Sequence, residues 1–183
     1  MEYFKKIKLK DGRDCILRNG TERDGQALLD IFISTHAETD YLRTYPDEST
    51  LTAEQEADFL REKIESPDSI EILAEVDGKV VATAGIEGFG PKVKTRHRCD
   101  FGISVGREYW GLGIGRALTL ACIECAKKAG FSQVELEVVA ENERAMNLYK
   151  SVGFVEYGRN PRGFRSRISG WQPLSLMLLD LEK

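Results

Sequence analysis

The strongest constraint in this sequence is a glycine-rich segment between an apolar run and an amphipathic stretch. In FGISVGREYWGLGIGRAL, residues 101–118, Gly111, Gly113 and Gly115 fall within five positions. Glycines at a helix start are costly unless the backbone must turn tightly or approach a ligand. Such a turn leaves the first N–H groups of the helix bare, and these groups and the helix dipole favour a negative ligand. The segment therefore predicts a phosphate or pyrophosphate site at a strand-to-helix turn.

Two common phosphate-binding patterns do not fit this segment. A P-loop continues from its last glycine with Lys and Ser or Thr, but Gly115 is followed by Arg and Ala. A dinucleotide fingerprint needs a further glycine where Leu118 stands. Glu135 and Glu137 follow at about the distance of a ribose-binding acid, so a Rossmann-like oxidoreductase remains a hypothesis. A purely structural turn is the alternative without a ligand.

Hydrophobic periodicity predicts strands and helices along the whole chain, and no repeat or linker divides it. Capping boxes at Thr21 and Thr52 begin two helices, and Pro67 ends the second. We expect helices over 21–35, 52–64, 113–129 and 142–152, and strands over 3–10, 14–18, 70–76, 79–87, 96–105, 134–139, 154–159 and 174–181. This order predicts one domain, residues 1–183, of the mixed α/β class.

Composition narrows the class of protein further. The 26 Lys+Arg against 30 Asp+Glu give a net charge of −4, which weighs against a nucleic-acid partner. No apolar run is long enough for a membrane span, and the N-terminus lacks the apolar centre of a signal peptide. We expect a cytoplasmic protein with no membrane partner. Cys122 and Cys125 share the apolar face of a predicted helix, which favours core thiols over a metal site, so we expect no metal.

Two segments resemble the signature motifs of one family. Trp110, Gly113 and Gly115 match motif A of the GNAT N-acetyltransferases, although Gln or Arg is usual at the position of Trp110. The segment ENERAMNLYKSVGF, residues 141–154, resembles motif B. The resemblance implies the GNAT-type acyl-CoA N-acyltransferase fold, with mostly antiparallel strands, a central parallel pair and flanking helices.

The resemblance also implies the donor site. In this family the glycine loop holds the pyrophosphate of acetyl-CoA, and main-chain groups of the preceding strand contact the acetyl group and pantetheine arm. We therefore assign acetyl-CoA binding to Ile103, Ser104, Val105, Trp110, Gly111, Leu112, Gly113, Ile114, Gly115, Arg116, Asn142 and Arg144.

Acetyl transfer to an amine needs a base for the amine and an acid for the departing thiolate. The resemblance places Tyr149 as the acid, and a core aromatic is its structural alternative. Asp100 is the base that we assign, while Glu87 and His97 are further candidates and ordered water could serve instead. His97 otherwise belongs to a solvated basic turn.

Charge patterning gives one indication about the acceptor. Residues 38–58 hold seven acidic residues and one basic residue, Arg43, so an acidic rim there would attract an amine cation such as a polyamine, an aminoglycoside or a protein amino group. A solvated helix face explains the same pattern. Opposing it, four arginines crowd a Gly- and Pro-containing stretch that we expect to be a loop: Arg159, Arg162, Arg165 and Arg167.

The sequence thus favours an acetyl-CoA-dependent N-acetyltransferase acting on a primary amine, either a small amine or a protein amino group. The alternative from another class is a non-catalytic CoA-binding module of the same fold. The apolar run at 176–179 fits either a strand buried on both faces or a sheet shared in a homodimer.

Overall fold

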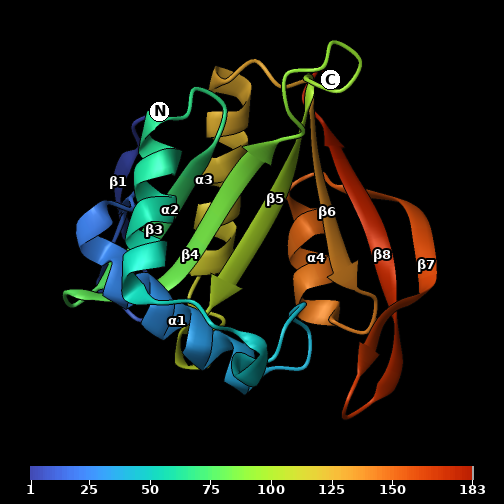
Figure 1. Ribbon diagram of the computed structural model, residues 1–183, viewed down its shortest axis with the longest axis horizontal. Helices are drawn as coiled ribbons and strands as arrows, with labels where there is room; N and C mark the ends of the chain where they lie inside the picture. Colours follow the sequence, from blue (N-terminus) through green and yellow to red (C-terminus); the bar gives the residue numbers. More distant parts are fainter. Residues whose placement is uncertain (183) are drawn as a thin grey trace.

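Figure 1 shows the computed structural model, which describes residues 1–182. Its eight strands form one sheet in the order β1-β2-β3-β4-β5-β6-β8-β7, in which β5 and β6 are parallel and the other neighbours antiparallel. The strands are β1 Phe4–Lys8, β2 Asp14–Asn19, β3 Ile70–Val76, β4 Lys79–Gly88, β5 Arg98–Val105, β6 Gln133–Val139, β7 Val155–Ser166 and β8 Gly170–Asp180. The α-helices are α1 Gly25–Glu38, α2 Ala53–Glu65, α3 Ile114–Lys128 and α4 Glu143–Ser151.

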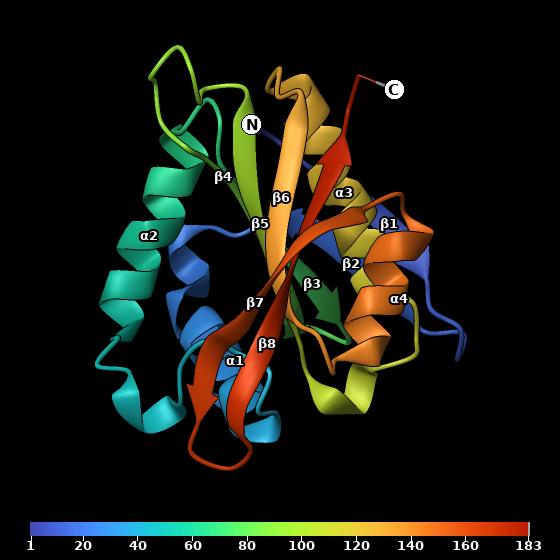
Figure 2. The same cartoon turned by 90° about the vertical axis from the view of Figure 1, so that its right-hand side faces the viewer.

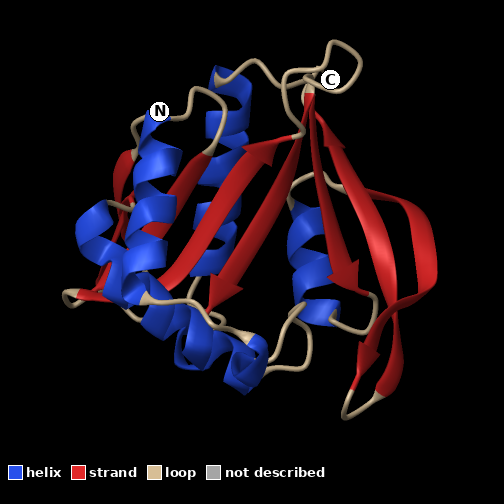
Figure 3. Ribbon diagram, viewed as in Figure 1, coloured by secondary structure: helices blue, strands red, loops and turns tan. Residues whose placement is uncertain are grey.

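The sheet lies between two pairs of helices (Figures 2 and 3). α1 and α2 cover one face, where Leu28 and Leu60 pack on Leu73 in a small cluster. α3 and α4 cover the other face, which carries the larger core. Cys122 and Cys125 are buried in that core, as expected from their helical spacing. The predicted mixed α/β class and its central parallel pair are confirmed, and the alternative of a Rossmann-like oxidoreductase is wrong, because that fold needs a parallel sheet.

Within residues 1–182, no helix is both long enough and apolar enough to cross a membrane.

The separation of β5 from β6 positions the rest of the molecule. The two strands pair only over Arg98–Asp100 and Gln133–Glu135, and then diverge (Figure 1). β5 stays paired with β4 as far as Val105, whereas β6 pairs along its whole length with β8. Beyond Asp100, the edge of β5 that faces β6 therefore carries main-chain groups that β6 does not pair.

The C-terminal hairpin corrects one prediction. We expected a loop around Arg159–Arg167, but β7 continues to Ser166 and pairs with β8. Pro161 is tolerated because β7 is an edge strand and its register with β8 is irregular between Asn160 and Phe164. The prediction was wrong because pairing with a long neighbouring strand outweighs local Gly and Pro signals.

Two glycines in neighbouring strands provide a matched test of packing. A Cβ at Gly85 would overlap the Glu71 carboxylate and lie 2.7 Å from the main-chain oxygen of Ile70, whereas a Cβ at Gly102 meets nothing within 4 Å. We expect Gly85→Ala to destabilise the protein by about 1–3 kcal/mol, because the Ile70 backbone cannot move aside. Gly102→Ala should leave the denaturation midpoint unchanged or slightly raised. Equal midpoints for the two variants in urea unfolding would contradict this account.

Candidate active site

The divergence of β5 and β6 opens a cavity of about 1200 Å³. Ten of the twelve residues that we assigned to the donor line it, together with both assigned catalytic residues: Asp100, Ile103, Ser104, Val105, Trp110, Gly111, Gly113, Gly115, Arg116, Asn142, Arg144 and Tyr149. The exceptions are Leu112 and Ile114, whose side chains pack against or within the core. Two motifs separated by more than twenty residues therefore meet at one place.

The glycine loop has the backbone that its sequence indicates. Gly111 and Gly113 have φ of 82° and 100°, in the left-handed region that favours glycine. Gly113 is the N-cap of α3, so the unpaired N–H groups of the first turn lie beside the cavity. Gly115 has a different role, because a Cβ there would lie 3.3 Å from Leu148 of α4. The third glycine thus lets α3 and α4 pack closely, while the first two shape the turn that leads into α3.

Trp110 contacts the end of β5 and two arginines. Its indole Nε1 donates to the main-chain oxygen of Val105 at 2.7 Å, which ties the loop to the end of β5. The guanidinium carbons of Arg107 and Arg144 lie 5.6 and 5.1 Å from the centre of its ring, within the range of cation–π attraction. Arg144 also reaches towards Gly111. Arg144 therefore brings positive charge to a loop in which motif A usually supplies Gln or Arg.

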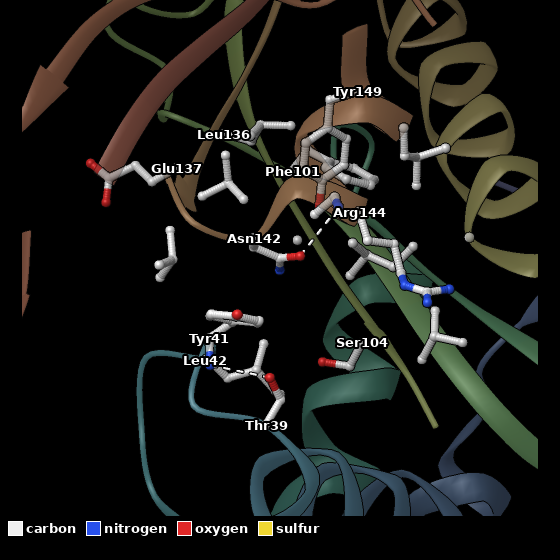
Figure 4. Close-up of a pocket in the computed structure, with 18 of the residues that line it drawn as sticks. Thr39, Tyr41, Leu42, Phe101, Ser104, Leu136, Glu137, Asn142, Arg144 and Tyr149 are labelled. Carbon is white, nitrogen blue, oxygen red and sulfur yellow. Dashed lines mark hydrogen bonds between the residues drawn. The ribbon is translucent and has the colours of Figure 1, made fainter. Parts of the chain in front are cut away.

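Tyr149 is held by aromatic packing. Its ring makes an edge-to-face contact with Phe101, with centroids 6.1 Å apart, and a tilted contact with Phe154 at 5.8 Å. The residue is 7% exposed, and burial raises the pKa of its phenol above the ordinary value. Figure 4 shows the ring reaching from α4 into the cavity, opposite Tyr41 and Leu42. The phenol is therefore protonated at neutral pH and can only donate a proton.

The three candidate bases lie in different places. Asp100 is on the cavity wall, where desolvation raises its pKa and Arg43 lowers it, while Glu137 and Glu135 raise it. Glu87 points to α2 and pairs with Lys63 at 2.9 Å. His97 is exposed in the turn before β5. Of these three residues, Asp100 is the one that faces the large cavity.

Two members of the predicted acidic rim, Asp47 and Glu48, are paired with an arginine. Arg167 at the tip of the β7–β8 hairpin binds Asp47 with two hydrogen bonds of 2.8 and 2.7 Å and Glu48 with one of 3.1 Å. The guanidinium also lies over the ring of Tyr45. One member of the basic cluster thus neutralises part of the acidic segment.

Asp40 completes this connection, which we call the hairpin clamp (Asp40, Tyr45, Asp47, Glu48, Ser166 and Arg167). The Asp40 carboxylate accepts hydrogen bonds from the hydroxyls of Tyr45, Ser166 and Ser169 and from the amide of Gln172. These bonds hold the pKa of Asp40 below its ordinary value, although desolvation opposes them. The clamp fixes the segment after α1 against the hairpin.

Several cavity residues carry no motif, so sequence reasoning missed them. The segment after α1 contributes Thr39, Tyr41, Leu42 and Arg43, and the far wall contains Leu136, Glu137, Tyr157 and Phe164. Arg43 and Glu137 approach to 3.9 Å across the cavity. These residues come together only in the folded chain, so the hydrophobic periodicity of the sequence does not reveal them.

A second, smaller cavity of about 290 Å³ adjoins the first, under α2. It is lined by Glu71 of β3, which is half-buried, and Glu71 accepts a hydrogen bond from Thr83. Desolvation raises the pKa of Glu71 to about 7, although Thr83 and Lys63 oppose the shift. In the sequence, Glu71 is one residue of the strand predicted over 70–76.

Comparison with known proteins agrees with this geometry. The model of the Acetyltransferase (GNAT) family matches residues 32–154. Human N-acetyltransferase 8B is 34% identical over 89 residues, 48% of this chain and 39% of the relative. An acetyltransferase of the GNAT family from Streptococcus pneumoniae superposes with a TM-score of 0.86 and 28% identity, over 91% of this chain and 99% of that one.

A protein from Salmonella typhimurium, solved with its cofactor acetyl-CoA, shares the fold at a TM-score of 0.79 and 19% identity, over 91% and 94% of the two chains. The alignments with the curated relatives span less than two fifths of their length.

The raised pKa of Glu71 makes a prediction about stability. Its ordinary value is 4.5, so between about pH 4.5 and 7 the folded protein binds more protons than the unfolded chain, and stability falls as pH rises. Glu71→Gln removes this dependence. We expect equal melting temperatures at pH 5 and a more stable variant at pH 8, by about 2 kcal/mol. A variant that is less stable than the wild type at pH 8 would contradict this prediction.

Proposed function

Because this chain belongs to the GNAT acetyltransferase family, we propose that it is an N-acetyltransferase that transfers the acetyl group of acetyl-CoA to a primary amine. The amine attacks the thioester directly while both substrates are bound. The observation that carries this proposal is that the left-handed glycine loop, the edge of β5 that β6 does not pair, and the buried phenol of Tyr149 all line one cavity. Each of these features serves one part of the donor.

The donor half of the cavity suits a long anionic molecule. The pyrophosphate lies at the N-terminus of α3, where main-chain N–H groups of residues 111–116 and the helix dipole stabilise negative charge. Arg144, stacked on Trp110, adds a cation. The pantetheine arm follows the edge of β5 at Ile103–Val105, which β6 does not pair and where the main-chain oxygen of Val105 accepts from Trp110. Asn142 is occupied as the cap of α4, since its side chain accepts from the N–H of Ala145 at 3.2 Å.

The reaction moves two protons. The amine nitrogen attacks the thioester carbon, the carbon–sulfur bond breaks, and the thiolate takes a proton from the Tyr149 phenol. The amine proton passes to the Asp100 carboxylate, whose pKa is raised by desolvation. Product release and exchange with solvent return both groups to their starting states.

The acceptor occupies the half of the cavity between residues 39–43 and the hairpin. This half combines aromatic rings, Tyr41 and Tyr157, with the charges of Arg43, Asp100 and Glu137. We propose a primary amine, either of a small molecule or of a protein. A CoA-binding module without turnover is the competing function, and Tyr149 favours the enzyme because a binding module needs no acid for a thiolate.

A melting experiment with acetyl-CoA, NADH and ATP tests the donor site. At about a hundred times its Kd, a ligand stabilises by about 2.7 kcal/mol, which raises Tm by about 5–10 °C in a chain of this size. We expect this rise with acetyl-CoA alone. Release of CoA thiol with a polyamine, an aminoglycoside or a peptide with a free N-terminus then tests turnover. A rise without any turnover would support the binding module, and a rise with NADH instead would refute the proposed donor.

The acid is tested by comparing two buried tyrosines, one that lines the cavity and one that does not. Tyr149→Phe removes the proton donor, so we expect kcat to fall about 100-fold with little change in acetyl-CoA affinity. Tyr3→Phe is the matched control, because Tyr3 is also a buried tyrosine, 9% exposed, but does not line the cavity. Equal kcat values for the two variants would remove the role assigned to Tyr149.

A further inference from the structure

The second cavity shares one wall with the first. Asp100, Gly102, Ile103 and Ser104 of β5 line both of them. The remaining wall of the smaller cavity comes from Phe59 and Lys63 of α2 and from β3 and β4. The cavity is large enough for several water molecules and is rich in polar groups that would hold them. Asp100 therefore lies at the boundary between the two cavities, and a proton bound there is next to the second one.

Glu71 and two glycines form the floor of the second cavity. Glu71, Gly85 and Gly102 are cross-strand partners on β3, β4 and β5, and strand alternation places all three on the face beneath α2. The Glu71 carboxylate extends over Gly85, where any Cβ would overlap it. Two glycines thus leave an open path along the sheet from β5 to Glu71.

Hydroxyl groups line the neighbouring row. Ser104 is the cross-strand partner of Thr83, and Thr83 donates a hydrogen bond to Glu71 Oε1. Cross-strand partners place their Cβ atoms about 5 Å apart, so one water molecule can connect the two hydroxyls. Each hydroxyl can accept a proton on one side and release one on the other. The order Ser104, Thr83, Glu71 is therefore a continuous route for a proton.

Within residues 1–182, no cation forms an ion pair with Glu71, although Lys63 is near enough to lower its pKa. Glu56 and Lys63 face it from α2, Glu87 from β4, and Asp100 lies on β5 across the cavity. The Lys63 ammonium binds Glu87 at 2.9 Å and lies over the ring of Phe59. Glu71 is thus a carboxyl group whose affinity for a proton is raised by burial and by the neighbouring carboxylates.

From this geometry, and on the basis of the proposed function, we propose that Glu71 is the terminal acceptor of the proton that the amine substrate loses. The N–H bond of the attacking amine breaks at Asp100. The proton then passes through water, Ser104 and Thr83, and an O–H bond forms on Glu71, so that Asp100 is a carboxylate again before the next amine binds. Glu71 releases the proton to solvent through the second cavity between turnovers.

The test compares kcat/KM over a pH series, using the amine that gives turnover. Glu71→Gln should lower kcat/KM at pH 7 by about tenfold and remove the rise near the Glu71 pKa of about 7, with recovery in alkali where hydroxide accepts the proton. Acetyl-CoA affinity should not change. Thr83→Val should reproduce this profile, whereas Thr83→Ser, which keeps the hydroxyl, should restore most of the rate. Glu62→Gln, on an exposed position of α2, controls for loss of a carboxylate.

The outcomes separate the two proposals. If Glu71→Gln keeps the wild-type pH profile, or if Thr83→Val and Thr83→Ser behave alike, the relay is refuted while the acetyltransferase stands. A loss of rate by the same factor at every pH would indicate a structural role and also refute the relay. If the wild-type protein acetylates no amine, the proposed function fails first and the relay fails with it.

Discussion

The pairing of β5 with β6 over only three positions is the constraint on which the remaining structure depends. A parallel pair that continued to Val105 would use the main-chain groups of β5 internally and close the cavity. Instead β8 holds β6 along its whole length, and β4 does the same for β5. Each strand has its hydrogen bonds satisfied on its outer side, so the inner edges can separate without loss of the sheet. The open edge, the start of α3 and the buried face of α4 then meet in one cavity.

The features that were predicted correctly from the sequence depend on residues close together along the chain. Gly111 and Gly113 were recognisable because positive φ has few alternatives to glycine, and the structure places both in the left-handed region. The capping box at Thr52 was recognisable because its two hydrogen bonds lie within four residues, and both are formed. Tyr149 was found through a motif of contiguous residues, and it lines the cavity as expected.

Contacts between distant residues explain what the sequence did not predict. The extent of β7 depends on its pairing with β8, which no local pattern of Arg, Gly and Pro encodes. The acidic segment and the basic cluster were interpreted as opposing surface charges, yet Arg167 and Asp47, 120 residues apart, form an ion pair. Glu71 lies in an unremarkable strand, and its unusual proton affinity arises only when α2 covers it.

The hairpin clamp has a consequence for how the cavity changes over evolutionary time. Residues 39–43 form one wall, but the position of that wall is set by Ser166 and Arg167, which belong to the last hairpin of the chain. A substitution at the hairpin tip can shift this wall without altering a residue that lines the cavity. No hydrogen bond described within residues 1–182 joins the glycine loop to this clamp, so this wall can vary while the loop stays fixed. Substitutions can therefore change one wall of the cavity independently of the other.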